Sequence, residues 1–376
     1  MLQNKIYQNY TIEIFKTFLT ILFGLSIIAW TVRAVNFLDL IVESGYPVST
    51  YFLYSILNLI GVLTKFFPLA FLLALILFIL KQIQENEFVV LWTSGVKKIQ
   101  IVHLFLYFSF FISLIFLLFS NFITPASLNK SRNLLSNQNI NSFLPTIRIQ
   151  EFSDSFSGFT FIVDKKFDNQ IENIFLQDNS NVLKNISSNK EDKSLTTIIA
   201  SNGLIEKDRM VLFNGQIISS NKKNEKNDLI KFEQLNIDLS NLQNRTIKTP
   251  KIQETGTLKL FECMKNQYFN NVKCKEDIKK DIVPLLNRRI VFPLFIPVVA
   301  LIASLLLLKV KKKKSLNKIG IFTLSFLVLL YAELIIRYTG LNQIINYIFL
   351  LSPFLLSFLA YIFLKIKFSN EFKLNE

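Results

Sequence analysis

Reactive side chains are scarce in this sequence. Its 376 residues include one histidine and two cysteines. Two cysteines are too few for a disulfide-rich scaffold or a cysteine-based metal cluster. The histidine, His103, lies near one end of an apolar run, where a histidine packed within a helix is commoner than a catalytic one.

Motifs that carry enzymatic chemistry are also missing. The sequence contains no GxxxxGK(S/T) phosphate loop, no HExxH zinc site, no CxxC pair and no GxSxG nucleophile turn. We therefore predict a protein that is not an enzyme and has no cofactor or metal of its own. Any work that the chain performs then needs energy from another subunit.

The N-terminus lacks the short apolar region and small-residue cleavage site of a secretory signal. Its first apolar run is long and ends at Arg33, so we expect a retained transmembrane helix. Hydrophobic residues make up 51% of the chain and come in blocks, which is typical of membrane proteins. The net charge of +15 does not predict nucleic-acid binding, because the basic residues gather beside the apolar runs and do not interleave with aromatics.

Six apolar runs are long enough to cross a membrane. We expect them at about 15–36, 61–80, 101–122, 290–308, 319–338 and 343–364, with residues 51–60 as an extension of the second. Between the third and fourth runs, apolar and polar residues alternate, as in Phe159-Thr160-Phe161 and Leu235-Asn236-Ile237, and Asn214-Gly215 gives a hairpin signal. Such strands indicate an all-β sandwich or jelly roll.

The predicted fold is therefore an α+β membrane protein with six transmembrane helices, three on each side of an inserted all-β jelly-roll domain. The expected boundaries are 1–125 for the first three helices, 126–283 for the β domain and 284–376 for the last three helices with the tail.

Lysines in the short loops predict the orientation. They collect after spans two, four and six, whereas loops 35–50 and 339–342 have neither Lys nor Arg. Both termini are then cytoplasmic and the β domain is periplasmic. In that oxidising space, Cys263 and Cys274 form either a disulfide or two unpaired thiols, and the sequence leaves both open.

Residues 85–98, ENEFVVLWTSGVKK, form a short amphipathic segment on the cytoplasmic side, between spans two and three. Apolar residues at i, i+3 and i+4 give one stripe on a helix of about two turns, formed by Phe88, Leu91 and Trp92. Glu87 lies in the first turn, and Gly95 is placed to end the helix. A helix this short needs a partner surface, which is either the headgroup layer or another protein.

Five cations map to the outer ends of the spans, against the orientation signal: Arg33, Lys65, Arg288, Arg289 and Arg337. One interpretation is that each extends to the headgroups, with Glu333 and Arg337 paired at i, i+4 on one helix face. The other is that several spans converge on a cavity, where these cations and Glu333 line a site for an anionic lipid.

The segment 85–98, with Glu87, Leu91 and Gly95 spaced as ExxxLxxxG, resembles the coupling helix of the LptF/LptG permease family, which extracts lipopolysaccharide from the bacterial inner membrane. The resemblance covers essentially the whole chain. It includes Lys65 to Pro68 at the start of span two, Thr124-Pro125 at the end of span three and LNRRIVFPLF before span four. It also includes the β-domain series GFTFIVDKK, NIFLQD, TTIIASNG, MVLFNGQII and LIKFEQLNIDL. The LNRR and NGQII segments look closer to the F branch than to the G branch.

The resemblance implies a non-enzymatic subunit of an ABC transporter in the inner membrane. Its implied partners are a second permease of the LptG type, a dimer of a cytoplasmic LptB-type ATPase, a periplasmic jelly-roll bridge of the LptC/LptA type, and lipopolysaccharide. Glu87 and the apolar stripe would dock into the ATPase. The family's lateral gates involve spans one and five, where Arg33, Glu333 and Arg337 fall.

Two other functions fit the same plan. One is a permease for another amphiphile such as a lipoprotein, and the other is a membrane-anchored assembly scaffold whose β domain binds a partner. Equimolar purification with an ATPase, and ATP-dependent release of lipopolysaccharide from vesicles, would favour the lipopolysaccharide permease over both.

Overall fold

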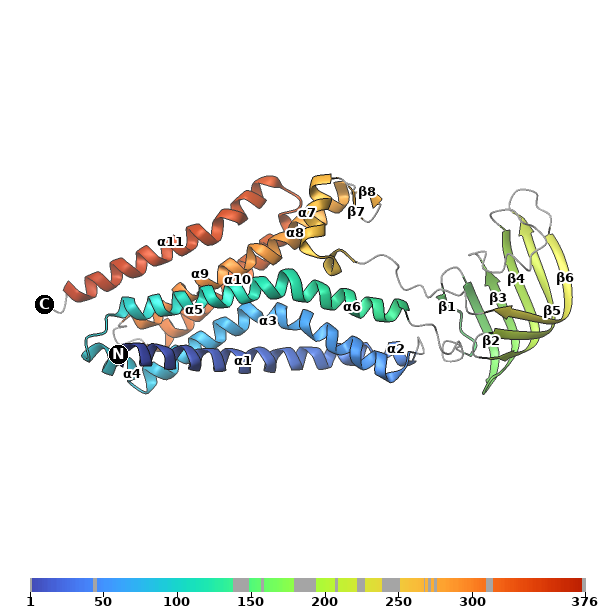
Figure 1. Ribbon diagram of the computed structural model, residues 1–376, viewed down its shortest axis with the longest axis horizontal. Coiled ribbons are helices and arrows are strands. Elements are labelled where there is room, and N and C mark those ends of the chain that lie inside the picture. Colours follow the sequence, from blue (N-terminus) through green and yellow to red (C-terminus); the bar gives the residue numbers. More distant parts are fainter. Residues whose placement is uncertain are drawn as a thin grey trace. The chain divides into compact units, whose positions relative to one another are not determined.

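The chain is described by a computed structural model (Figure 1). The described residues are 2–42, 46–137, 149–156, 159–178, 194–206, 209–221, 227–238, 251–266, 268–269, 272–273, 276–308 and 314–373. They belong to two compact units. The helical unit contains Met1–Thr31, Leu57–Asn129 and Lys251–Glu376, and the sheet unit contains Val32–Ile56 and Lys130–Pro250.

Helices make up the part of the chain before the sheet. They are α1 (Leu2–Asn36), α2 (Asp39–Val42), α3 (Val48–Gln84), α4 (Glu87–Thr93), α5 (Lys98–Leu118), the π-helix η1 (Phe119–Ile123) and α6 (Thr124–Asn137). After the sheet come the 3₁₀-helix η3 (Ile252–Glu254), α7 (Thr257–Asn266), the short strands β7 (Tyr268–Phe269) and β8 (Val272–Lys273), α8 (Glu276–Ile290), the 3₁₀-helix η4 (Phe292–Leu294), α9 (Phe295–Ala303), the 3₁₀-helix η5 (Ser304–Leu307), α10 (Lys314–Tyr338) and α11 (Gln343–Lys373).

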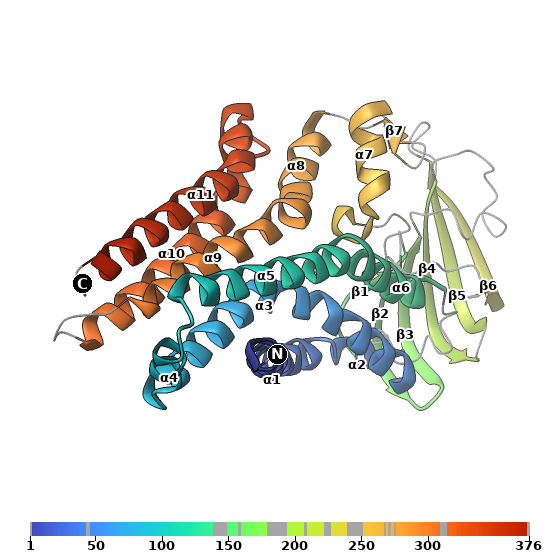
Figure 2. The ribbon, with the colours of Figure 1, turned by 60° about the vertical axis from the view of Figure 1, so that its left-hand side comes forward.

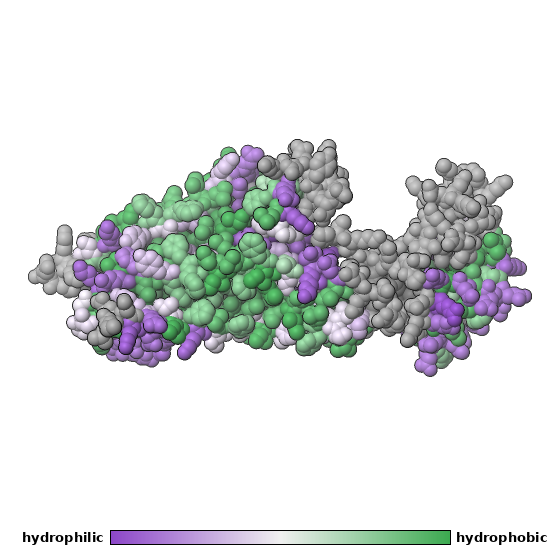
Figure 3. Space-filling model, in the orientation of Figure 1, coloured by the Kyte–Doolittle hydropathy of each residue, from purple (hydrophilic) through white to green (hydrophobic). Residues whose placement is uncertain are grey.

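Six helical ranges are long and apolar enough to cross a membrane. They are Lys5–Ile41, Val48–Gln84, Lys98–Leu135, Lys280–Leu307, Lys318–Tyr338 and Gln343–Ser369. Each contains one of the six predicted spans or most of it, and apolar residues cover most of the visible surface of these helices (Figure 3). The six predicted spans are therefore confirmed as helices by length and composition.

The fourth span lies at the centre of the helical unit. All nine residues of α9 are buried, and the helix packs against α5, α10 and α11. Of the most apolar stretch of this span, 83% is buried, compared with 17% for the first and the last spans. The outer helices therefore keep apolar faces for lipid or for partner proteins, and α9 does not.

The fourth span is also broken, although its sequence reads as one apolar run. The chain changes from α8 to the 3₁₀-helix η4 at Phe292, continues as α9, and ends in η5. Pro293 and Pro297 lie in this stretch. Because proline has no backbone N–H and its ring collides with the preceding turn, a continuous α-helix cannot pass through both positions undisturbed.

The sheet has six strands: β1 (Ser153–Phe156), β2 (Phe159–Phe167), β3 (Gln170–Asp178), β4 (Ser194–Ile205), β5 (Arg209–Asn221) and β6 (Asn227–Asp238). Each strand pairs antiparallel with the next in chain order. Alternate residues of β2, such as Phe159, Phe161 and Val163, are buried in the core of the sheet unit, as their alternation predicts. The described strands form one meander, so the predicted jelly roll is not confirmed.

The predicted hairpin at Asn214-Gly215 is wrong. Strand β5 continues through both residues, and its register with β4 and β6 is the same on either side of them. Asn214 has a positive φ of 51° within the strand. A Cβ on Gly215 would lie 2.4 Å from the carbonyl oxygen of Ile199 and 2.4 Å from the ring of Phe232. Glycine is therefore needed here for close packing between strands and not for a turn.

The compact units differ from the predicted domains in two places. Residues 32–56 belong to the sheet unit, where the Tyr51 hydroxyl donates to the Ala34 carbonyl at 3.0 Å. Helices α7 and α8 belong to the helical unit although most of them lies within the predicted β domain. Cys263 on α7 is buried and disulfide-bonded, and Cys274 lies outside the described residues.

Candidate functional site

Helix α4 is the predicted surface segment, and both of its ends are sharply defined. Asn86, just before the helix, has a left-handed φ of 57°, and Gly95 follows it with a φ of 89°. The N–H of Val96 donates to the Leu91 carbonyl at 3.1 Å, and the N–H of Gly95 donates to the Trp92 carbonyl at 3.2 Å. This pair of bonds is a Schellman ending, so Gly95 ends the helix as the sequence predicts.

The apolar stripe of α4 points into the chain's own core. Phe88 is 1% exposed and Leu91 is 5% exposed. The ring of Phe88 meets Tyr10 of α1 edge-on at 6.2 Å and stacks with Trp92 at 6.0 Å. Burying a phenylalanine and a leucine in this way stabilises the attachment of α4 by about 1.5–3 kcal/mol per side chain.

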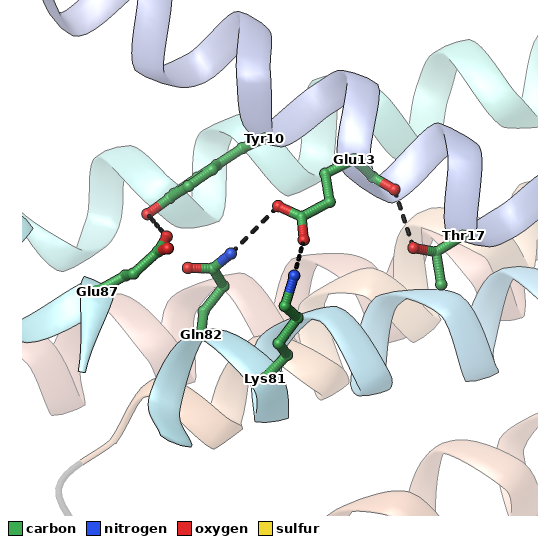
Figure 4. Close-up of polar contacts among 6 residues, drawn as sticks. All are labelled: Tyr10, Glu13, Thr17, Lys81, Gln82 and Glu87. Atoms are coloured by element: carbon green, nitrogen blue, oxygen red, sulfur yellow. Dashed lines mark hydrogen bonds and ion pairs between the residues drawn. The ribbon is translucent and has the colours of Figure 1, made fainter. Parts of the chain in front are cut away.

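Polar contacts add a second attachment, between α1 and the segment that runs from α3 into α4 (Figure 4). The Tyr10 hydroxyl donates to Glu87 Oε2 at 3.3 Å. One turn along α1, Glu13 accepts from Lys81 Nζ at 2.7 Å and from Gln82 Nε2 at 3.3 Å. The Lys81 side chain is half-exposed, so its ion pair is screened by solvent and chiefly fixes the register between the helices.

A cation links α4 to the last helix. Lys98 Nζ, at the start of α5, lies 4.7 Å from the Trp92 ring of α4 and 5.7 Å from the Phe368 ring of α11. In Figures 1 and 2, α4 and the C-terminal end of α11 lie at the same end of the helical unit. Each such cation–π contact is worth roughly 0.5–1 kcal/mol at a half-exposed site. These contacts connect α4 to α1 and, through Lys98 of α5, to α11.

The free face of α4 is made of other residues. Val89 is 49% exposed and Val90 is 66% exposed, and Glu87 and Thr93 are exposed beside them. The five residues that the sequence assigns to a docking surface are thus divided: Phe88 and Leu91 hold α4 on the bundle, Trp92 is half-buried, and only Glu87 and Gly95 are exposed. The valines were missed because the apolar periodicity identifies the stripe but not the side it faces.

At the other end of the helical unit, Arg288 of α8 forms an ion pair with Glu333 of α10. The prediction that Glu333 pairs with Arg337 is therefore wrong. Arg337 is exposed, and the described part of the chain gives it no ion pair. Both Arg288 and Glu333 are about 40% exposed, so the pair lies at the edge of the bundle rather than in its core.

The next residue, Arg289, is 4% exposed and is occupied by the chain itself. Its Nη1 donates to the Thr255 carbonyl at 2.9 Å and to Thr257 Oγ1 at 3.0 Å, and its Nη2 donates to the Gln253 carbonyl at 2.8 Å. A guanidinium with these donors engaged does not form part of an open lipid site. Its predicted role in lipid binding is replaced by a structural one.

The remaining predicted lipid-binding residues lie on separate elements. Lys65 is exposed on α3 and Arg337 is exposed on α10, whereas Arg33 is half-buried in the last turn of α1 and belongs to the sheet unit. Lipid binding by these three side chains stays a prediction. His103 has a structural contact, because its Nε2 lies 3.1 Å from the Tyr361 hydroxyl of α11.

Within the described ranges, no three His, Cys, Asp or Glu side chains gather where they would hold a metal ion. The helical unit therefore presents an anchored surface helix at one end and a network of bonded arginines at the other.

Comparison with known proteins identifies the family. No curated protein matches the chain. A family described as the lipopolysaccharide export system permease LptF/LptG matches residues 10–367, which is nearly the whole chain. The match includes all six apolar helical ranges, in part or in full, and the whole sheet. The chain belongs to the LptF/LptG family of lipopolysaccharide export permeases and is a multi-pass inner-membrane protein.

Proposed function

We propose that the chain is a non-catalytic permease subunit of an ABC transporter, and that α4 is the helix through which a separate cytoplasmic ATPase moves the bundle. The observation that carries this proposal is the two-sided packing of α4. One side is buried against the bundle through Phe88 and Leu91, and the other exposes Val89 and Val90. A helix that is held firmly and still presents an apolar face is suited to receive a partner and to pass on its displacement.

Charge distribution supports the orientation in this proposal. Lysines follow spans two, four and six on the side that holds α4, so this side and both termini are cytoplasmic. In the order of the chain, the first three spans then precede a periplasmic sheet unit and the last three follow it. We propose that this unit passes lipopolysaccharide to a periplasmic bridge of similar domains, with a second, LptG-type permease completing the bundle.

The attachment of α4 suggests how force enters the bundle. Tyr10 and Glu13 connect α4 and the end of α3 to α1, and Lys98 connects α4 to α11. Of the six spans, those of α1 and α11 also have the smallest buried share of their most apolar stretch, 17% in each. Closure of the ATPase would therefore shift outer helices around the buried α9, and a lipid cavity between the two permeases would narrow.

The docking face of α4 is tested by changing Val90 to Asp in the full transporter. We expect Val90→Asp to abolish co-purification of the ATPase, because a carboxylate in an apolar groove is desolvated without a partner. Leu258→Asp is the matched control, since Leu258 is 72% exposed on α7, at the far end of the helical unit (Figure 1). It should leave the ATPase bound.

A second variant separates docking from simple contact with lipid. Glu87→Lys reverses the charge beside the valines, and we expect it to weaken ATPase binding and ATP-dependent release of lipopolysaccharide from vesicles. A helix that only lies in the headgroup layer would keep its ATPase with Lys at this position, because a cation favours anionic headgroups. Full ATPase retention by both Val90→Asp and Glu87→Lys would contradict the proposal.

A further inference from the structure

Prolines leave two backbone carbonyls of spans three and four without their usual donors. In an α-helix, the N–H of each residue donates to the carbonyl four residues earlier, and proline has no N–H to give. Pro125 at the start of α6 cannot give this bond to the Asn121 carbonyl, which lies in the π-helix η1, and Pro293 in η4 cannot give it to the Arg289 carbonyl. Away from water, an unpaired carbonyl costs several kcal/mol, roughly, so each needs another donor.

Both carbonyls receive a side-chain donor from a different segment. The hydroxyl of Thr257, at the start of α7, donates to the Asn121 carbonyl at 3.2 Å. The side-chain Nδ2 of Asn121 donates to the Arg289 carbonyl at 3.2 Å and to the Leu117 carbonyl of its own helix at 2.9 Å. Asn121 therefore connects the proline-interrupted part of span three to that of span four.

The Arg289 side chain completes the network. Its guanidinium donates to Thr257 Oγ1 and to the carbonyls of Gln253 and Thr255. All three acceptors are neutral. The hydrogen bonds of this buried cation therefore go to two backbone carbonyls and one hydroxyl of residues 253–257. Removing the contacts would leave a guanidinium desolvated without partners, which is strongly unfavourable.

The network lies where the chain passes between the two units. Asn121 and Pro125 come shortly before the chain leaves the helical unit after Asn129. Gln253 to Thr257 come directly after it returns at Lys251. The outgoing and returning connections of the sheet unit are thus bonded to the same point of spans three and four.

We infer that Asn121, Thr257 and Arg289 form a connection clamp, a positioning site that holds the two connections of the sheet unit at the junction of spans three and four for lipid transfer. The inference is independent of which protein binds α4. The clamp acts through hydrogen bonds between segments, so a backbone donor supplied within span three should not replace it.

The test uses the full transporter, with Thr257→Val as the main variant because it removes the hydroxyl and keeps the side-chain volume. We expect amide hydrogen exchange in residues 252–260 to become at least roughly tenfold faster, because the hydroxyl loses two hydrogen bonds, one to the Asn121 carbonyl and one from Arg289. Release of lipopolysaccharide from vesicles should fall several-fold. Thr257→Ser keeps the hydroxyl and should behave as the parent protein.

Two controls identify the mechanism. Thr339→Val removes another buried hydroxyl, which donates to the Ile336 carbonyl at the end of the preceding helix α10, and it should leave exchange in residues 252–260 unchanged. Adding Pro125→Ala to Thr257→Val gives the Asn121 carbonyl a donor from its own helical segment and not from α7, so residues 252–260 should keep their fast exchange.

The outcomes separate clearly. Parent-like exchange and release in Thr257→Val would overturn the inference. Recovery of protection in residues 252–260 on adding Pro125→Ala would also overturn it, because the hydroxyl would then serve only to satisfy the Asn121 carbonyl. If the Thr257→Val transporter does not assemble, Arg289→Lys gives the second reading, because a lysine cannot keep the forked contacts. Unchanged exchange in residues 252–260 of Arg289→Lys would equally overturn it. Exchange needs neither ATP hydrolysis nor lipid, so this result does not depend on the proposed role of α4.

Discussion

The hydroxyl of Tyr10 donates to the carboxylate of Glu87 across 77 positions of the sequence, at 3.3 Å. The bond connects the first turns of α1 to the first turn of α4 (Figure 4). It lies beside the edge-on contact between the Tyr10 and Phe88 rings, so the same tyrosine holds α4 by a polar and an apolar contact. Only the polar contact can be removed without changing the packing.

Tyr10→Phe should therefore weaken the connection selectively. We expect it to lower the free energy of unfolding of the purified chain by about 0.5–1.5 kcal/mol, the net value of one hydrogen bond. It should also uncouple α4, so that ATP hydrolysis continues while lipopolysaccharide release falls. Tyr7→Phe, one turn earlier on α1 and half-exposed, is the control. It should change neither the free energy of unfolding nor the release of lipopolysaccharide. Equal loss of hydrolysis and release in Tyr10→Phe would argue against a coupling role.

The two faces of α4 should respond differently to truncation. Phe88→Ala removes a fully buried ring and should cost about 3–5 kcal/mol of stability in the isolated chain. Val89→Ala removes half-exposed atoms and should change stability by no more than about 0.5 kcal/mol. Thermal unfolding in detergent, before any ATPase is added, measures both. Equal stabilities would mean that the stripe is not what attaches the helix.

The ion pair between Arg288 and Glu333 should appear as an energetic coupling between α8 and α10. Because both side chains are partly exposed, we expect a coupling of about 0.5–1 kcal/mol in a double-mutant cycle of Arg288→Gln and Glu333→Gln. Arg337→Gln serves as the comparison and should not couple to Glu333→Gln. If Glu333 coupled more strongly to Arg337 than to Arg288, the pairing within α10 would be the one formed.

Gly340 should not tolerate a side chain. A Cβ there would lie 1.9 Å from the carbonyl oxygen of Lys280 and 2.9 Å from Pro284, so Gly340→Ala must separate α8 from the turn after α10 and lower the melting temperature. Gly320→Ala is the matched control. Beyond its chain neighbours and the nearby backbone of its own helix, no atom lies within 4 Å of its added Cβ, and alanine favours the helix by about 1 kcal/mol.

The features predicted correctly from the sequence are those that depend on residues close together in the chain. The six spans follow from the length of the apolar runs, and the ends of α4 follow from Gly95 and the stripe beginning at Phe88. Alternation identified strand residues such as Phe161 correctly, but a meander and a jelly roll have the same alternation. Strand order depends on pairing between distant segments, which a period of two does not specify.

The site was predicted only in part, for the same reason. Position on a helix suggested that Glu333 meets Arg337, yet the partner came from another helix. Asn121 and Thr257 were missed because neither is unusual in its own segment. A local signal did exist, since Pro125 removes a donor for the residue four positions earlier, but the sequence does not say which hydroxyl replaces it.

The burial of α9 bears on how the protein is made. Its main neighbour α5 is synthesised before the six strands, and α9 is synthesised after them. During that interval the face of α5 that α9 will cover lacks this neighbour. In the proposed orientation, the bundle cannot reach its final packing until the intervening strands have crossed the membrane, and a ribosome stalled within them would leave a half-built protein in the bilayer.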